Sequence, residues 1–190
     1  KGFNDGLALT FDDGPDLETT PKILEILRTK NVKATFFVIG KKAEQFPEVL
    51  KTIDKEGHLI ANHSYQHSYF IGTFGTKKLT EDIEKCSAII EKIIGKKPLF
   101  FRPPFGVTNP RYLRALKKLN LASIGWSGRS FDTVNKSKNL LVKRVKKSLN
   151  TTEILLFHDT QKVTVEALPE IIEYCKEKGI KIVPLQELIS

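Results

Sequence analysis

The stretch Leu7-Ala8-Leu9-Thr10-Phe11-Asp12-Asp13-Gly14-Pro15 joins an apolar run to two adjacent carboxylates and a turn signal. A short apolar run that ends at Gly and Pro is typical of a buried strand. Successive side chains of a strand point to opposite faces, so at its end one carboxylate can bind a cation while its neighbour reaches a water on that cation. The stretch therefore predicts a strand that leads into a metal-dependent site.

A second stretch, His63-Ser64-Tyr65-Gln66-His67, holds two of the four histidines, spaced i, i+4. We expect a helical turn here, because that spacing would place both imidazoles on one face. With Asp13, the two histidines make three protein ligands and leave a position open, as in catalytic zinc sites. The plainer alternative is an acidic turn and a solvated histidine pair, but the joint occurrence of both stretches favours the metal site.

Short β-type runs alternate with amphipathic helical segments along the chain, and no linker rich in Gly, Pro or Ser interrupts them. Alternation of this kind predicts parallel strands joined by right-handed crossovers, in one α/β domain over residues 1–190. We expect strands over 7–11, 34–39, 59–62, 99–102, 121–126, 154–158 and 180–184. We expect helices over 21–31, 47–56, 80–94, 110–119, 138–149 and 165–178.

Polar residues follow the ends of different predicted strands, as they do at the catalytic rim of barrel enzymes. They are Asp12, Asp13, His63, Arg102, Asp132 and His158. A doubly wound open sheet is the alternative for the same alternation. The shared rim, the seven predicted strands and the chain length favour a distorted, incomplete (β/α)7 barrel, similar to a TIM barrel.

The stretch Leu99-Phe100-Phe101-Arg102-Pro103-Pro104-Phe105-Gly106 leads an apolar strand into a charge and a rigid loop. Arg102 can hold a carboxylate such as Asp12 by charge-assisted hydrogen bonds. The prolines fix the loop, so a backbone N–H near Phe105 can point at a developing oxyanion. An exposed arginine that closes a turn is the alternative. Pro104, Leu156 and Trp126 are the further candidates for contacts with substrate.

His158 ends the apolar run Glu153-Ile154-Leu155-Leu156-Phe157-His158. A metal site on the same rim favours a proton donor over a purely structural histidine. Asp132, within Trp126-Ser127-Gly128-Arg129-Ser130-Phe131-Asp132-Thr133, can bond this imidazole and raise its pKa, although a loop cap would use the same residue type.

The net charge of +9 raises the question of nucleic acid as a partner. The lysines are dispersed, and the densest cluster, Lys143-Arg144-Val145-Lys146-Lys147, alternates with apolar residues and has no interleaved aromatic platform. We therefore expect no nucleic-acid partner, and an anionic surface fits the charge better. No apolar stretch reaches the ~20 residues of a membrane span.

Two cysteines, Cys86 and Cys175, lie in helical patterns, and we expect buried free thiols there. The chain does not begin with Met, so we expect a processed or truncated piece of a longer product. An extracellular or cell-envelope location and a monomeric state are the expectations that we carry forward.

Taken in chain order, the five segments quoted above, which begin at Leu7, His63, Leu99, Trp126 and Glu153, resemble those of the polysaccharide deacetylases, the NodB homology domain of carbohydrate esterase family four. The resemblance runs from Thr10 to His158 and implies the same distorted (β/α)7 barrel. It also implies roles for individual residues: Asp12 as general base, Asp13, His63 and His67 as metal ligands, Arg102 as the residue that orients Asp12, His158 as general acid, and Asp132 as its partner.

The resemblance further implies a metal-dependent hydrolase that removes N-acetyl, or also O-acetyl, groups from a glycan such as peptidoglycan, chitin or xylan. Zn²⁺ suits the ligand set best, and Co²⁺ or Ni²⁺ also fits. The alternatives are a glycan-binding module that has lost catalysis and a hydrolase of a small cyclic or linear amide.

Three positions depart from the pattern of this family. Arg129 and Thr133 stand where the family often has Asp and Trp, and Phe105 stands where tyrosine is frequent. These departures bear on the shape of the acetyl pocket and on the tuning of His158. Arg129 adds a cation near the cleft, which favours an anionic sugar or a phosphate-bearing polymer.

Overall fold

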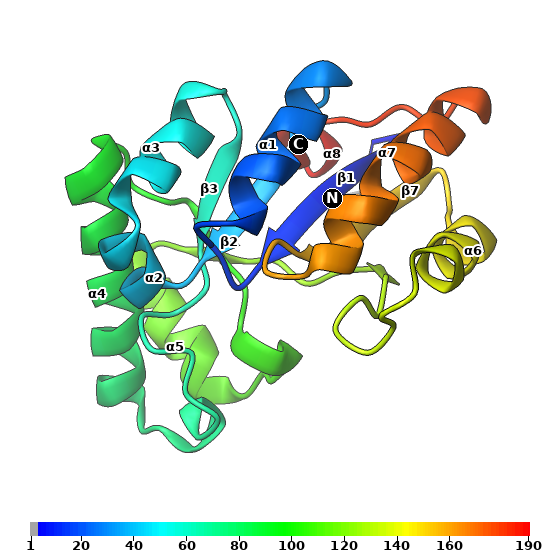
Figure 1. Ribbon diagram of the computed structural model, residues 1–190. Coiled ribbons are helices and arrows are strands. Elements are labelled where there is room, and N and C mark those ends of the chain that lie inside the picture. Colours follow the sequence, from blue (N-terminus) through cyan, green and yellow to red (C-terminus); the bar gives the residue numbers. More distant parts are fainter. Residues whose placement is uncertain (1–3) are drawn as a thin grey trace.

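The structure is a computed structural model that describes residues 4–190. Seven parallel strands form one sheet in the order β5-β4-β3-β2-β1-β7-β6. The sheet curls into a distorted (β/α)7 barrel with helices on its outside (Figure 1), and β5 and β6 are its two edges. The strands are β1 (Gly6–Asp12), β2 (Thr35–Val38), β3 (Leu59–Asn62), β4 (Phe100–Phe101), β5 (Ala122–Ser123), β6 (Gly128–Arg129) and β7 (Thr152–His158).

The helices begin and end where local residue chemistry favours it. Pro occupies the first turn of α3 and α5, the Asn109 side chain accepts hydrogen bonds from the first N–H groups of α5, and Gly95 ends α4 at a φ of 72°. The helices are α1 (Thr19–Thr29), α2 (Gly40–Gln45), α3 (Pro47–Lys55), α4 (Thr76–Ile94), α5 (Pro110–Leu119), α6 (Lys138–Ser148), α7 (Lys162–Glu177) and α8 (Leu185–Leu188), with short 3₁₀ turns at Ile71–Thr73 and Pro104–Gly106.

The alternation of side chains along β1 decides which residues face the site. Leu7, Leu9 and Phe11 belong to the large apolar cluster under the outer helices, where the ring of Phe11 stacks between those of Phe36 and Phe157. Ala8 belongs to a smaller cluster that includes Leu185 and Leu188 of α8. Because strand side chains alternate, Asp12 points to the same inner side as Ala8.

The expected strands and helices agree with the structure except at several places. The strand predicted over 121–126 is reduced to β5, and β6 follows separately. Residues 180–184 form only a single bridge, between Leu7 and Ile182. α2 and α8 were not predicted. Between β5 and β6, the carbonyls of Ile124 and Gly125 accept hydrogen bonds from the Arg102 side chain instead of a strand partner, which explains why an apolar segment here does not extend the sheet.

Cys86 and Cys175 are buried free thiols, as predicted. Within residues 4–190, none of the helices combines the length and the apolar character that crossing a membrane would require.

Candidate active site

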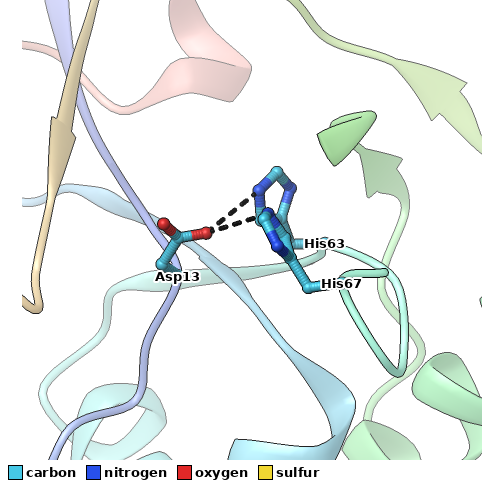
Figure 2. A group of neighbouring side chains, drawn as sticks. All are labelled: Asp13, His63 and His67. Atoms are coloured by element: carbon cyan, nitrogen blue, oxygen red, sulfur yellow. Dashed lines mark ion pairs between the residues drawn. The ribbon is translucent and has the colours of Figure 1, made fainter. Parts of the chain in front are cut away.

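Three side chains that could hold a metal ion converge at the carboxyl end of the strands. Asp13 Oδ1 lies 3.4 Å from Nε2 of His63 and 3.2 Å from Nε2 of His67 (Figure 2). One donor atom from each of the three residues lies within 4.8 Å of the other two. Nδ1 of His63 donates to the carbonyl of Arg102 at 2.7 Å, which leaves the lone pair of Nε2 free for a cation. One carboxylate and two imidazoles thus meet around a single point.

The charge states of these groups suit a cation. Burial alone would raise the pKa of Asp13, but its interactions with His63, His67 and His158 hold that pKa well below its ordinary value. Burial, followed by the charge of His63, lowers the pKa of His67. At neutral pH the site therefore offers an ionised carboxylate beside a neutral His67 imidazole, the forms that bind metal.

The expected helical turn between the two histidines is wrong. The segment is a loop in which Ser64 (φ 69°) and His67 (φ 51°) both adopt left-handed backbone conformations. Side chains secure the loop: Asn62 Oδ1 accepts from the Ser64 N–H at 2.8 Å, Ser64 Oγ accepts from the His67 N–H at 2.9 Å, and Asp82 accepts from the Tyr65 N–H at 2.9 Å. The imidazoles converge because the loop folds back, and not because they share a helix face.

Asp12 lies beside the three possible ligands and is held from the other side. Arg102 is fully buried, and its Nη1 donates to Asp12 Oδ1 at 2.7 Å and to Thr10 Oγ1 at 2.9 Å. Its guanidinium also stacks on the ring of Phe37 at 3.9 Å. Asp12 Oδ2 lies 3.8 Å from Nε2 of His63. One oxygen is therefore fixed by the arginine, and the other faces the possible metal ligand His63.

His158 stands across the cavity and is paired with Asp132. Its Nδ1 donates to Asp132 Oδ1 at 2.8 Å, its backbone N–H donates to Oδ2 at 2.7 Å, and Thr164 Oγ1 also donates to Oδ2 at 2.7 Å. Burial lowers the pKa of His158, but the hydrogen bond and charge of Asp132 outweigh it, with help from Asp13 and Asp12, so the pKa is raised. Nε2 lies 4.0 Å from Asp13 Oδ2 and can present a proton to the cavity.

These groups line a cavity of about 230 Å³ together with Phe105, Trp126 and Leu156. Pro104 is buried, and its neighbour Pro103 lines the cavity. The half-exposed ring of Phe105 lies edge-on to His67 at 4.7 Å and stacks on Tyr69 at 5.4 Å. The cavity therefore has an apolar wall beside a polar rim. This combination suits a ligand in which a methyl group adjoins a polar carbonyl.

Sequence reasoning missed Thr164 and the part that the buried residue Asp159 plays next to the site. Thr164 supports Asp132 from the first turn of α7, where no motif marks it. Asp159 accepts from Thr20 Oγ1 at 2.6 Å, and its N–H donates to the Asp12 carbonyl at 3.3 Å. For Asp159, the available signal in the sequence was its position directly after His158.

Comparison with known proteins agrees with the geometry. The family model for polysaccharide deacetylase matches residues 4–124. A peptidoglycan-N-acetylglucosamine deacetylase of Bacillus cereus is 37% identical over 188 residues, 97% of this chain and 68% of that protein. The peptidoglycan-N-acetylmuramic acid deacetylase PdaC of Bacillus subtilis is 35% identical over 182 residues, 96% of this chain and 38% of that protein.

The crystal structure of the Bc1960 peptidoglycan N-acetylglucosamine deacetylase superposes on this chain with a TM-score of 0.93 at 36% identity, and the match covers 98% of this chain and 89% of that one. Sequence, fold and the grouping of polar side chains therefore agree. The chain belongs to the polysaccharide deacetylase family.

Proposed function

We propose that this chain is a metal-dependent hydrolase that removes N-acetyl groups from peptidoglycan. The observation that carries the proposal is the convergence of three groups on one cavity: the possible ligand set Asp13, His63 and His67, Asp12 held by Arg102, and His158 held by Asp132. The names of the two relatives described above support peptidoglycan as the substrate class.

The ligand set fits a divalent metal ion, and Zn²⁺ is the ion that we propose. Two imidazole nitrogens and one carboxylate oxygen suit zinc, although cobalt or nickel would accept the same donors. His63 has its second nitrogen bonded to the Arg102 carbonyl, the outer support that metal-ligating histidines usually have. Such an ion, when bound, makes a water more acidic and polarises the acyl oxygen of the substrate.

The residues of this chain then move the protons. Asp12 accepts a proton from the attacking water through Oδ2, because Oδ1 is engaged by Arg102. As the bond between the acyl carbon and nitrogen breaks, His158 donates its Nε2 proton to the departing nitrogen, giving acetate and a free amine. An amine anion is a very poor leaving group, so an amide substrate needs this donor far more than an ester does. We expect Phe105, Trp126 and Leu156 to hold the acetyl methyl group.

The two alternatives fit less well. A binding module without catalysis does not require the paired Asp12–Arg102 and His158–Asp132 contacts, which are both complete. A pocket for a small amide would be favoured by closure of the loop after His67. Tyr69 and Phe70 of that loop are 87% and 72% exposed, so the loop stands beside the cavity, an arrangement that favours a polymer.

Acetate release tests the proposal. The purified protein, loaded with Zn²⁺, is incubated with purified peptidoglycan and with N-acetylglucosamine oligomers, and acetate is measured by a coupled assay. We expect release that a chelator stops and that added Zn²⁺ restores. A zinc-loaded protein that releases no acetate from any of these glycans would refute the function.

A further inference from the structure

Arg129 lines the cavity next to Trp126 and Leu156 of the apolar wall. It lies on β6 in register with Leu156 of β7, and both residues line the cavity with Thr133. Arg129 and Thr133 are exposed at this wall. Because Leu156 faces the cavity, its neighbour in register, Arg129, is placed to contact a ligand bound there.

Aromatic rings hold the guanidinium of Arg129 in place. Its Cζ lies 4.7 Å from the ring centre of Phe131 and 5.9 Å from that of Trp126. Stacking on ring faces restricts the side chain but leaves the N–H groups at its edge available. The guanidinium is thus positioned in advance for a ligand that accepts hydrogen bonds.

The other charges of this rim are already engaged. Asp12 is paired with Arg102 at 2.7 Å and Asp132 with His158 at 2.8 Å. Arg129, by contrast, forms neither an ion pair nor a side-chain hydrogen bond with any residue between 4 and 190. A positioned arginine without a carboxylate of its own is suited to a carboxylate from the substrate.

The chemistry of the proposed substrate offers such a group. Peptidoglycan strands alternate N-acetylglucosamine with N-acetylmuramic acid, which carries a lactyl ether ending in a carboxylate on the carbon next to the acetamido group. The carboxylate is free where no stem peptide is attached and becomes an amide where one is. Relatives named for each of the two sugars are 37% and 35% identical to this chain, so overall identity does not decide between them.

We propose that Arg129 binds the free lactyl carboxylate of N-acetylmuramic acid and directs hydrolysis to that sugar, a specificity that rests on the function proposed above. An arginine fork and a carboxylate can form two parallel hydrogen bonds, a geometry that an N-acetylglucosamine residue cannot satisfy. The preferred substrate is accordingly a peptidoglycan strand from which stem peptides have been removed.

The test compares three substrates: stem-free peptidoglycan strands, the same strands with their carboxylates converted to primary amides, and N-acetylglucosamine oligomers. Mass spectrometry of muramidase digests shows which sugar has lost acetyl. We expect the wild type to deacetylate muramic residues of the stem-free strands, and amidation to lower kcat/KM about ten- to a hundredfold, mainly through KM. Arg129→Gln should lower kcat/KM on the stem-free strands by a similar factor, at least about tenfold more than on the oligomers.

Arg144 supplies the matched control. Its guanidinium stacks on the same Phe131 ring at 3.9 Å, it is also exposed, and it does not line the cavity. Arg144→Gln removes the same charge from the same neighbourhood, and we expect it to leave the substrate preference of the wild type. Arg129→Lys keeps the charge without the fork and should fall between the wild type and Arg129→Gln.

Equal loss on all three substrates in Arg129→Gln would show a structural role and overturn the specificity. Acetyl loss from glucosamine residues alone would also overturn it, while leaving the deacetylase function intact. A zinc-loaded wild type that releases acetate from none of the three would refute the function itself, and the specificity with it.

Discussion

Asp12 has two oxygens in different surroundings. Oδ1 is fixed by the buried Arg102, and Oδ2 faces the possible metal ligands at 3.8 Å from His63 Nε2. Asp12→Asn keeps the shape and removes the ability to take a proton. We expect turnover to fall by about 10² to 10⁴, the usual range for loss of a general base. Metal content, measured by mass spectrometry of the dialysed protein, should stay at the wild-type level.

The matched variant for Asp12 is Asp13→Asn, which weakens the proposed ligand set and should lower metal content as well as turnover. Wild-type turnover in Asp12→Asn would exclude Asp12 as the base. Loss of metal from Asp12→Asn would instead place Asp12 among the ligands.

His158 depends on Asp132 for its protonation. Burial lowers the pKa of His158, and Asp132 more than compensates, so the raised pKa keeps the imidazole, our proposed proton donor, charged to higher pH. In Asp132→Asn the burial remains and the compensating charge is lost, so the pKa of His158 falls. We expect the alkaline limb of the kcat profile to move to lower pH, measured with saturating substrate across pH 5 to 10.

Thr164→Val is the milder companion change, because it removes one of the hydrogen bonds to Asp132 and keeps the carboxylate. It should move the alkaline limb in the same direction by less. A limb that stays in place in Asp132→Asn would mean that another group is the acid.

At the scale of elements, the turn after β1 packs directly on the residue after β7. A Cβ at Gly14 would overlap the buried carboxylate of Asp159, and Thr20 holds that carboxylate at 2.6 Å. Gly14→Ala must therefore move the turn that carries Asp13. We expect metal affinity to weaken about 10- to 100-fold and stability to fall by about 1–3 kcal/mol, measured by metal titration and thermal unfolding.

Gly75→Ala provides the control for Gly14→Ala. A Cβ at Gly75 meets no atom within 4 Å, and its φ of −64° suits alanine. This variant should bind metal as the wild type does. Unchanged metal affinity in Gly14→Ala would show that the turn can shift without moving Asp13.

The elements also show why sequence reasoning succeeded in some places and failed in others. β1 and β7 were predicted because their apolar runs have the length of a strand and lead into polar residues. Asp13 and His63 were expected together because the ends of parallel strands share one edge, and His67 was expected beside His63 from the i, i+4 spacing. Their role as metal ligands stays a prediction. The helical turn was wrong because left-handed Ser64 and His67 carry no glycine signal, and side chains distant in sequence, such as Asp82, hold the loop.

At the scale of the whole molecule, the two ends of the barrel differ in chemistry. At the end opposite the site, His58 is only 5% exposed, and its Nδ1 accepts from the Ala34 N–H at 3.2 Å. Burial, together with the charge of Lys33, lowers the pKa of His58 from 6.5 to about 4. A buried neutral histidine makes the fold sensitive to acid, independently of the catalytic rim.

The sign of this effect follows from proton uptake. Between pH 6.5 and about 4 the unfolded chain protonates His58 and the folded chain does not, so stability falls as the pH falls through that window. His58→Asn keeps an acceptor for Ala34 and does not titrate. The free energy of unfolding falls between pH 7 and 4.5, and we expect this fall to be about 1–3 kcal/mol smaller in the variant than in the wild type. Urea unfolding of the metal-free proteins measures it. Equal losses in the two proteins would exclude His58 as the cause.

The overall architecture was predictable because alternating patterns and polar strand ends specify a parallel barrel without reference to loops. An incomplete barrel was predicted, but the break in the chain between β5 and β6 at 124–127 was not. It depends on whether the carbonyls of Ile124 and Gly125 bond to a strand or to a side chain, and Arg102 is distant from them in sequence. The shapes of the loops beside the cavity, such as that of Tyr69, likewise depend on contacts formed only in the folded chain.

Arg102 also bonds to the segment between β5 and β6, where the barrel is open. Its Nε and Nη2 donate to the carbonyls of Ile124 and Gly125, at 3.3 Å and 2.8 Å, while Nη1 holds Asp12. One guanidinium therefore both bridges the gap between β5 and β6 and orients Asp12, the proposed base. If β5 and β6 separate there, Arg102 is free to move away from Asp12, and we expect activity to be lost even while the other strands stay folded.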